Sequence, residues 1–260
     1  MEIISSRQNP NIKNIVKLLG SAKYRLDQGL AVADGIHLVQ SLLQNNFVVR
    51  QLVLAESALD NSEIIQIVET ANVEKLIVRD SLHTAISDVS TDVGVLAVFD
   101  LPESRAPEAL SFDAVLLENI QDPGNVGTIL RTTAAAGVQR VYLSTGCASV
   151  WSPKVLRAGM GAQFGLEIFE TADLAGIIRT SEVPVLATSL QATESIYNQD
   201  LRQPTAWLFG NEGQGISVEL ESLVSKKVII PQAGSAVESL NVAVATAICL
   251  YEQLRQRIQT

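Results

Sequence analysis

The stretch DAVLLENIQDPGNVGTILRTTAAAG, residues 113–137, changes its period part-way along. Residues 113–118 form a continuous apolar run, typical of a strand buried on both faces, whereas the residues after the turn follow helical spacing. The intervening Asp-Pro-Gly-Asn predicts the turn, with Asn125 as the cap of the helix. A buried strand followed directly by a helix indicates an α/β fold with a mainly parallel sheet.

Similar apolar runs, separated by helical patterns, continue downstream at 140–144, 184–188, 206–210 and 227–231. They predict a sheet covered by helices on both faces. Ligands of such sheets bind beyond the carboxyl ends of the strands. The loops that follow these strands are therefore the candidate functional segments.

Upstream, a smaller α/β unit is predicted from short runs, rich in β-branched residues, that alternate with amphipathic stretches. These runs lie at 30–34, 51–55, 75–79 and 94–100. Residues 101–111 concentrate Pro, Ser and charge without periodicity, as a linker does. We therefore expect two domains, 1–105 and 106–260.

The composition excludes several classes of protein. With 47% hydrophobic and 18% charged residues, the chain has enough apolar surface to fold throughout. It has no secretory pattern and no apolar stretch long enough to span a bilayer, which predicts a cytoplasmic protein without a membrane partner. Cys147 and Cys249 are far apart and belong to no His/Cys cluster, so we expect reduced thiols and no metal site.

Charge is distributed unevenly along the chain. The net charge of −9 and pI near 4.8 argue against a protein whose whole surface grips nucleic acid. Residues 1–25 nevertheless carry five basic residues against Glu2 alone, a local balance of +4. This segment is either a phosphate-contacting arm or a solvated helix face. The basic residues are Arg7, Lys13, Lys17, Lys23 and Arg25.

Two loops after predicted strands carry distinctive polar residues. In 118–137, Arg131 shares a helix face with Thr128, and near the helix N-terminus it would attract phosphate, although a surface Arg on a capped helix is equally compatible. In 208–217, three glycines within six residues allow close backbone approach, and Glu212 is the charged residue among them. The loop 208–217 matches neither a dinucleotide fingerprint nor a Walker loop. The glycine-rich passage 159–165 is interpreted as packing.

A third loop precedes the C-terminal helical pattern. Ser239 occupies the expected cap position, with Asn241 close behind, and an apolar helical face follows. Taken alone, these two residues are more often capping groups than catalysts. His37 and His83 both lie in the first domain, so a Ser-His-Asp or Cys-His centre is improbable. Arg, Glu, Ser and Asn suit group transfer from an already activated donor, in which positioning supplies most of the catalysis.

Together the three loops resemble a known family. DPGNVGTILRTTAAAG, LFGNEGQGIS and IPQAGSAVESLNVAVATAICLYE match, in order and spacing, the three motifs of the SpoU/TrmH RNA ribose 2′-O-methyltransferases of the SPOUT class. The segments SSRQNPNIKNIVKLL, KYR and ADGIHLVQSLL resemble the substrate-binding domain that many such proteins carry. The resemblance covers nearly the whole chain.

This resemblance implies a deep trefoil knot in the second domain, an exception to the usual unknotted topology, and a first domain related to RNA-binding ribosomal proteins. It implies a homodimer whose active sites form at the subunit interface. It also implies S-adenosylmethionine as cofactor, bound largely by backbone groups. The cofactor-binding positions are Thr188, Ser189, Leu190, Phe209, Gly210, Ile230, Ser239 and Leu240.

The family's catalytic positions fall on Asn125, Arg131, Glu212, Ser239 and Asn241. A guanidinium is a poor base, so Arg131 is expected to bind a phosphate and stabilise developing alkoxide charge. The implied activity is methylation of a ribose 2′-hydroxyl in structured RNA, with 23S ribosomal RNA favoured. A tRNA substrate, a non-catalytic RNA-binding assembly factor, and methyl transfer to a small molecule or protein remain alternatives.

Two segments depart from the family pattern. Residues 234–239 look one residue longer than usual, which predicts an altered loop over the cofactor. Asp92-Val93 stands where the family often has Pro-Gln. Neither departure changes the five catalytic positions.

Overall fold

The computed structural model describes residues 3–87, 94–103, 109–234 and 238–258. Asp92-Val93 and residues 235–237 of the longer loop lie outside this described part. The chain forms two compact units, Met1–Glu103 with Trp151–Phe164, and Ser104–Val150 with Gly165–Thr260. None of the helices in the described ranges combines the length and apolarity needed to cross a bilayer.

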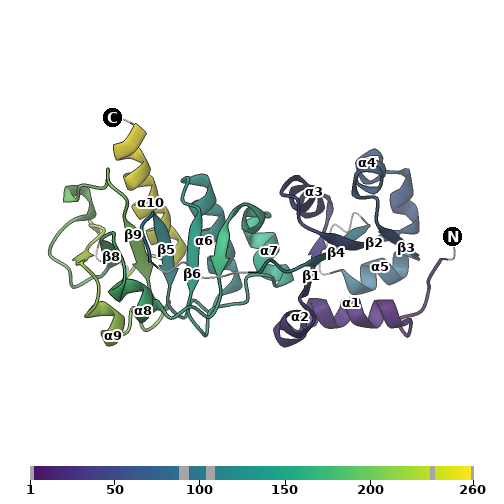
Figure 1. Ribbon diagram of the computed structural model, residues 1–260, viewed down its shortest axis with the longest axis horizontal. Helices are drawn as coiled ribbons and strands as arrows, with labels where there is room; N and C mark the ends of the chain where they lie inside the picture. The colour runs from purple at the N-terminus through teal and green to yellow at the C-terminus, as the bar shows by residue number, and fades with distance from the viewer. Residues whose placement is uncertain (1–2, 88–93, 104–108, 235–237, 259–260) are drawn as a thin grey trace. The chain divides into compact units, whose positions relative to one another are not determined.

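Unit 1 is a four-stranded sheet of order β1-β4-β2-β3, in which β4 runs antiparallel to β1 and β2 while β2 and β3 are parallel. Its core packs α1 and α5 on one face of the sheet, and α3 and α4 lie on the opposite face (Figure 1). The elements are α1 (Pro10–Gly20), α2 (Ala22–Gln28), β1 (Leu30–Asp34), α3 (Ile36–Gln44), β2 (Val49–Ala55), η1 (Glu56–Asp60), α4 (Ser62–Ala71), β3 (Glu74–Val78), α5 (Asp80–Ile86), β4 (Val95–Asp100), α7 (Pro153–Gly159) and η2 (Ala162–Gly165).

The segment Trp151–Phe164 belongs to unit 1, although the sequence pattern placed it in the second domain. An aromatic cluster accounts for this difference, because Phe164 packs on Phe47 and Phe99 with ring centroids 5.1 and 5.6 Å apart. Trp151 joins the same cluster. The passage 159–165 therefore serves packing, as predicted.

Unit 2 contains a six-stranded sheet of order β10-β8-β9-β5-β6-β7 in which every pair is parallel. The α/β class with a parallel sheet is thus confirmed. The sequence pattern missed β7, which is too short to show a period. The elements are β5 (Ala114–Leu117), α6 (Pro123–Ala135), β6 (Arg140–Leu143), β7 (Glu167–Phe169), α8 (Leu174–Arg179), β8 (Val185–Thr188), η3 (Ile196–Asn198), β9 (Ala206–Phe209), α9 (Val218–Glu221), β10 (Lys226–Val228) and α10 (Val242–Ile258).

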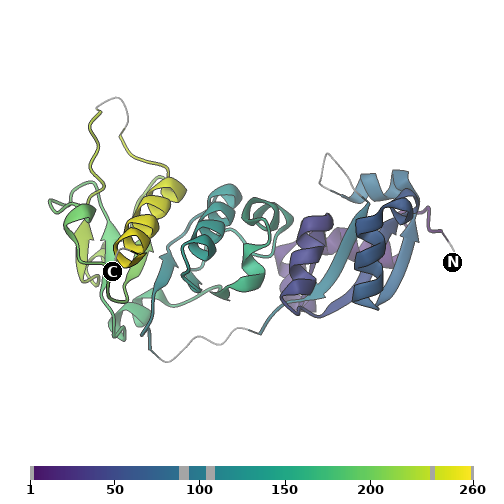
Figure 2. The same cartoon turned by 90° about the horizontal axis from the view of Figure 1, so that it is seen from above.

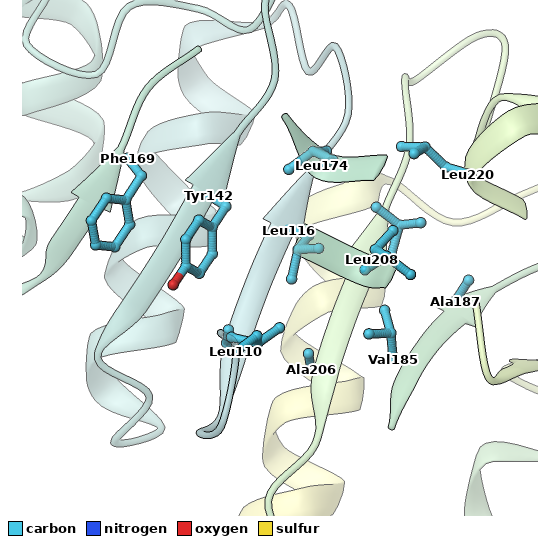
Figure 3. Packing of buried hydrophobic residues seen from close by; sticks show 12 residues of the cluster. Leu110, Leu116, Tyr142, Phe169, Leu174, Val185, Ala187, Ala206, Leu208 and Leu220 are labelled. Atoms are coloured by element: carbon cyan, nitrogen blue, oxygen red, sulfur yellow. The ribbon is translucent and has the colours of Figure 1, made fainter. Parts of the chain in front are cut away.

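Helices cover both faces of this sheet. On one face Leu116, Tyr142 and Leu208 from the strands pack with Leu174 of α8 and Leu220 of α9 (Figure 3). On the other face α6 and α10 lie side by side (Figure 2). The strand order does not test the trefoil knot, which stays a prediction.

Candidate active site

A pocket of about 660 Å³ lies at the carboxyl ends of β8, β9 and β10. Its lining comes mainly from residues 187–191, 210–216 and 238–242. Parallel strands end at one edge of a sheet, so segments distant in sequence meet there. Of the predicted cofactor positions, Phe209 is buried and does not line the pocket. Those that line it are Thr188, Ser189, Leu190, Gly210, Ile230, Ser239 and Leu240.

The glycine loop after β9 is folded tightly on itself. A Cβ atom at Gly210 would lie 2.3 Å from the carbonyl carbon of Gly215 and 2.4 Å from the nitrogen of Ile216. Gly215 itself has φ +71°, in the left-handed region. Any side chain at position 210 would therefore force the two arms of the loop apart.

Glu212 joins this loop to the start of α6. Its carboxylate accepts hydrogen bonds from the backbone N–H groups of Gln121 and Asp122, each at 3.3 Å, and from Asn125 Nδ2 at 3.0 Å. Partial burial raises the pKa of Glu212, but these hydrogen bonds outweigh it and hold the pKa below its ordinary value. The side chain is consequently an anion at neutral pH.

Asn125 and Asn241 extend this contact to the third loop. Asn241 Nδ2 donates to Asn125 Oδ1 at 3.0 Å, while Asn241 Oδ1 accepts from the N–H groups of residues 243 and 244. Asn241 is therefore the cap of α10, and the expectation that Ser239 caps this helix is wrong. A single hydrogen-bonded chain, Glu212 to Asn125 to Asn241, thus links the three loops.

The cap of α6 also differs from expectation. The helix begins at Pro123, and Asp122 Oδ1 accepts from Asn125 N at 2.8 Å. Proline favours the first helical position, which leaves the cap to the residue before it. The Asp-Pro pair in the sequence indicates Asp122 as the cap. Because Asp122 caps the helix, the Asn125 side chain is free to donate to Glu212.

The electrostatics of the pocket favour a cationic ligand. Glu212, Glu221 and Glu238 are the charged residues of its described lining, which contains no Lys, Arg or His. Lys227 offsets one of them through an ion pair with Glu221 at 3.0 Å. A sulfonium ion gains from this field, whereas a donor that carries phosphates would be repelled. Apolar lining residues and close backbone approach suit the adenosine of S-adenosylmethionine.

Comparison with known proteins identifies the family. Residues 114–251 match the model of the SpoU rRNA methylase family, and residues 9–97 match that of an MRM3-like substrate-binding domain. The chain belongs to the SpoU rRNA methylase family. Both the recognition of this family from three motifs and that of a separate N-terminal domain are confirmed.

Two relatives and one solved structure align with almost the whole chain. An uncharacterised tRNA/rRNA methyltransferase of Synechocystis is 34% identical over 98% of this chain and 94% of its own. The 23S rRNA (guanosine(2553)-2′-O)-methyltransferase RlmP of Bacillus subtilis is 29% identical over 96% and 98%. The crystal structure of the SpoU methyltransferase AviRb from Streptomyces viridochromogenes with the cofactor AdoMet has a TM-score of 0.89, 26% identity and coverage of 96% and 99%.

Arg131 stands apart from the other SpoU motif residues. Its side chain is exposed on α6, makes no hydrogen bond or ion pair to any described residue, and is not among the residues that line the pocket. The expectation that it lies near the N-terminal end of α6 is wrong, because the helix already begins at Pro123. Arg131 thus presents a free guanidinium outside the pocket.

The five basic residues of the N-terminal segment have different environments. Arg25 is 4% exposed and donates to the carbonyl oxygen of Leu18 at 2.8 Å, so it is a structural residue and not an RNA contact. Arg7 donates to the carbonyl oxygen of Ala85. The exposed residues without such a backbone contact are Lys13, Lys17 and Lys23.

Cys147 and Cys249 are both free thiols, the first half-buried and the second buried. Burial raises the pKa of Cys147 and, more strongly, that of Cys249 above the ordinary value, so neither is a thiolate at neutral pH. Cys147 Sγ accepts from Ile120 N at 3.3 Å, which fixes the loop before α6. The described residues contain no group of His, Cys, Asp or Glu able to hold a metal ion.

Proposed function

We propose that this protein transfers the methyl group of S-adenosylmethionine to a ribose 2′-hydroxyl of 23S ribosomal RNA. The observation that carries this proposal is the hydrogen-bonded chain from Glu212 through Asn125 to Asn241, which joins three loops beside a pocket with an acidic lining. The relatives RlmP and AviRb support the reaction class, since both are named as methyltransferases.

The methyl donor occupies the pocket in this proposal and supplies an electrophilic methyl group on a positively charged sulfur. The backbone of residues 188–190 and of Gly210 borders the donor, and Leu240 and Ile230 provide its apolar walls. Glu212 fixes the glycine loop and contributes negative charge. Ser239 and Asn241, at the rim, are the residues that face the reacting ribose.

Arg131 acts on the RNA side of the reaction. Its guanidinium binds the phosphate next to the target nucleotide and stabilises negative charge as it develops on the 2′-oxygen. The 2′-oxygen forms a bond to the methyl carbon, the carbon–sulfur bond breaks, and the hydroxyl proton leaves to water or to the phosphate. Arg131 does not take this proton, because a guanidinium is a poor base.

A second copy of the chain completes the site. The lining described for one chain has no cation, whereas Arg131 is exposed on α6, the helix that packs on α10. On α10, Val244, Tyr251 and Ile258 are spaced seven residues apart and are 48, 50 and 74% exposed. Side chains at this spacing share a helix face, and an apolar face of this kind favours pairing with another helix. The resulting homodimer brings Arg131 of one protomer to the pocket of its partner.

The RNA contact of unit 1 is the exposed face of α1 and the start of α2. Lys13 and Lys17 are four residues apart and therefore share a helix face, and Lys23 follows on α2. The Lys17 ammonium lies 5.4 Å from the centroid of the Tyr24 ring, which holds that side chain in place. Such exposed cations suit the RNA backbone.

The test is to incubate the purified protein and methyl-tritiated S-adenosylmethionine, in parallel, with total RNA or with ribosomal particles from cells that lack this protein. We expect label in 23S rRNA at one position that resists alkaline cleavage, because a methylated 2′-oxygen cannot attack the adjacent phosphate. Label in tRNA would identify tRNA, and not 23S rRNA, as the substrate. Cofactor binding without label in RNA or ribosomal particles would contradict the proposed acceptor, and no cofactor binding would contradict the enzyme.

A further inference from the structure

We propose that Asn211 is a positioning residue for the methyl donor: it closes the glycine loop 210–216, ties this loop to residue 119, and thereby sets Glu212 against the start of α6. The inference deepens the proposed function and rests on it. Asn211 lines the pocket, but neither the motif comparison nor the charge pattern assigns it a role.

The Asn211 side chain uses both ends of its amide. Its Nδ2 donates to the carbonyl oxygen of Asn119 at 2.8 Å, and its Oδ1 accepts from the N–H groups of Gly213 and Gln214, each at 3.0 Å. The backbone carbonyl of Asn211 also accepts from Gly215 N at 2.9 Å. One residue therefore both closes the loop and anchors it to the end of β5.

The anchor point is itself held firmly. Asn119 has φ +53°, a left-handed conformation that a non-glycine residue keeps only where its neighbours impose it. Its N–H donates to Ser144 Oγ at 2.9 Å. A Cβ atom at Gly146 would lie 2.4 Å from Asn119 Oδ1, so the Asn119 side chain lies directly against the backbone of Gly146. The hydrogen bond from Asn211 thus fixes the glycine loop to a rigid position.

Glu212 follows Asn211 directly, so its carboxylate goes where the loop places it. Its two hydrogen bonds from the backbone, from Gln121 N and Asp122 N, are long, at 3.3 Å each. Contacts near the limit of hydrogen-bond distance are lost by a small displacement. Without the Asn211 anchor, Glu212 moves away from these N–H groups, and its pKa returns towards the ordinary value.

The first measurement is calorimetric titration of the full-length protein with S-adenosylmethionine between about pH 4 and 8, a range that brackets carboxyl titration. For Asn211→Ala we expect affinity at neutral pH to fall about tenfold, the equivalent of one anchoring hydrogen bond, and the loss of affinity on acidification to begin at higher pH. Asn211→Asp keeps the acceptor but sets a carboxylate oxygen against the Asn119 carbonyl, so it should show the same two changes. This second variant provides the test if the alanine variant does not fold.

A double-mutant cycle distinguishes positioning from a general loss of structure. If Asn211 acts through Glu212, the affinity of Asn211→Ala/Glu212→Gln should resemble that of the weaker single variant. Asn61→Ala is the matched control, because Asn61 caps α4 in unit 1 and its loss should leave donor binding unchanged. Wild-type affinity and pH dependence in both Asn211 variants, or losses that multiply in the double variant, would overturn the inference. A wild-type protein that binds no donor would overturn the proposed function as well.

Discussion

At the scale of single residues, substitution of Arg131 should affect catalysis without affecting binding of the methyl donor. Arg131 is exposed and does not line the pocket. Arg131→Ala should therefore leave the affinity for S-adenosylmethionine unchanged and lower the methylation rate by about 10²-fold or more, as loss of an oxyanion-stabilising group does. Arg131→Lys keeps the charge without the bidentate fork, so its methylation rate should lie between those of the wild type and Arg131→Ala. Tritium incorporation and calorimetry measure the two quantities, and a near-normal rate in Arg131→Ala would refute the assignment.

Glu212 makes donor binding depend on pH. Burial raises the pKa of Glu212. The hydrogen bonds from Asn125 and from the backbone of residues 121 and 122 lower it by more than burial raises it, so the pKa lies below the ordinary value of 4.5. Its stabilising contribution is therefore complete above that ordinary value and is lost as pH falls through the lowered pKa. We expect affinity for the donor to stay constant from neutral pH to about 5 and then to fall. Glu212→Gln should bind more weakly at neutral pH and lose this acid limb; an unchanged limb would assign it to another group.

At the scale of elements, α10 is anchored to the sheet by buried amide contacts. Gln253 Oε1 accepts from Trp207 Nε1 at 2.5 Å, and its Nε2 donates to Asp113 Oδ1 at 2.8 Å. Gln253→Ala leaves the buried indole N–H unpaired, which should lower the free energy of unfolding by about 1–3 kcal/mol. Urea denaturation measures this loss. Gln66→Ala, on the exposed face of α4, should cost almost nothing, and equal losses in both variants would exclude the anchoring role.

The strands were predictable because burial demands apolar, β-branched runs. Of the ten strands in the described part of the chain, nine appear where the sequence pattern predicted them, and the exception is β7, of only three residues. Helix starts were less accurate, since Asp122, Asn125, Ser239 and Asn241 are all possible caps by composition. For α6 the Asp-Pro pair is a local signal for Asp122, whereas the role of Asn125 depends on hydrogen bonds to Glu212 and Asn241 on distant loops, which sequence spacing does not encode.

The sequence predicted which motif residues form the site, but it did not predict how their side chains are arranged. A count of charges could not distinguish Arg25, which binds backbone carbonyl oxygens inside unit 1, from the exposed Lys13 and Lys17. Asn211 passed unnoticed because Asn is common in turns, and its importance comes from Asn119 on another loop. Likewise, only the aromatic packing of Trp151–Phe164 assigns that segment to unit 1.

At the scale of the whole molecule, an acidic protein with pI near 4.8 has to bind RNA through a local surface. Lys13→Ala/Lys17→Ala should reduce the magnitude of the slope of log affinity against log salt by about 1.4 to 1.8, because each lost phosphate contact contributes about 0.7 on a single strand and about 0.9 on a duplex. Filter binding at several salt concentrations measures the slope. Glu63→Gln/Glu69→Gln on α4 changes the net charge by the same magnitude and should leave the slope unaltered. Equal slopes for wild type and the lysine variant would remove α1 from the RNA contact.

The proposed homodimer makes a prediction that single variants cannot test. Gly210→Ala distorts the donor pocket because its Cβ meets the Gly215 backbone, whereas Arg131→Ala removes a group outside that pocket. If each pocket uses the Arg131 of its partner, a mixed dimer of the two inactive variants contains one intact site and one doubly defective site. Unfolding and refolding the variants together should therefore restore about a quarter of wild-type activity, because half of the dimers are mixed and each has one working site. Mixing without subunit exchange is the control. No recovery, despite mixed dimers detected by mass spectrometry, would place Arg131 and the donor pocket of each site on the same chain.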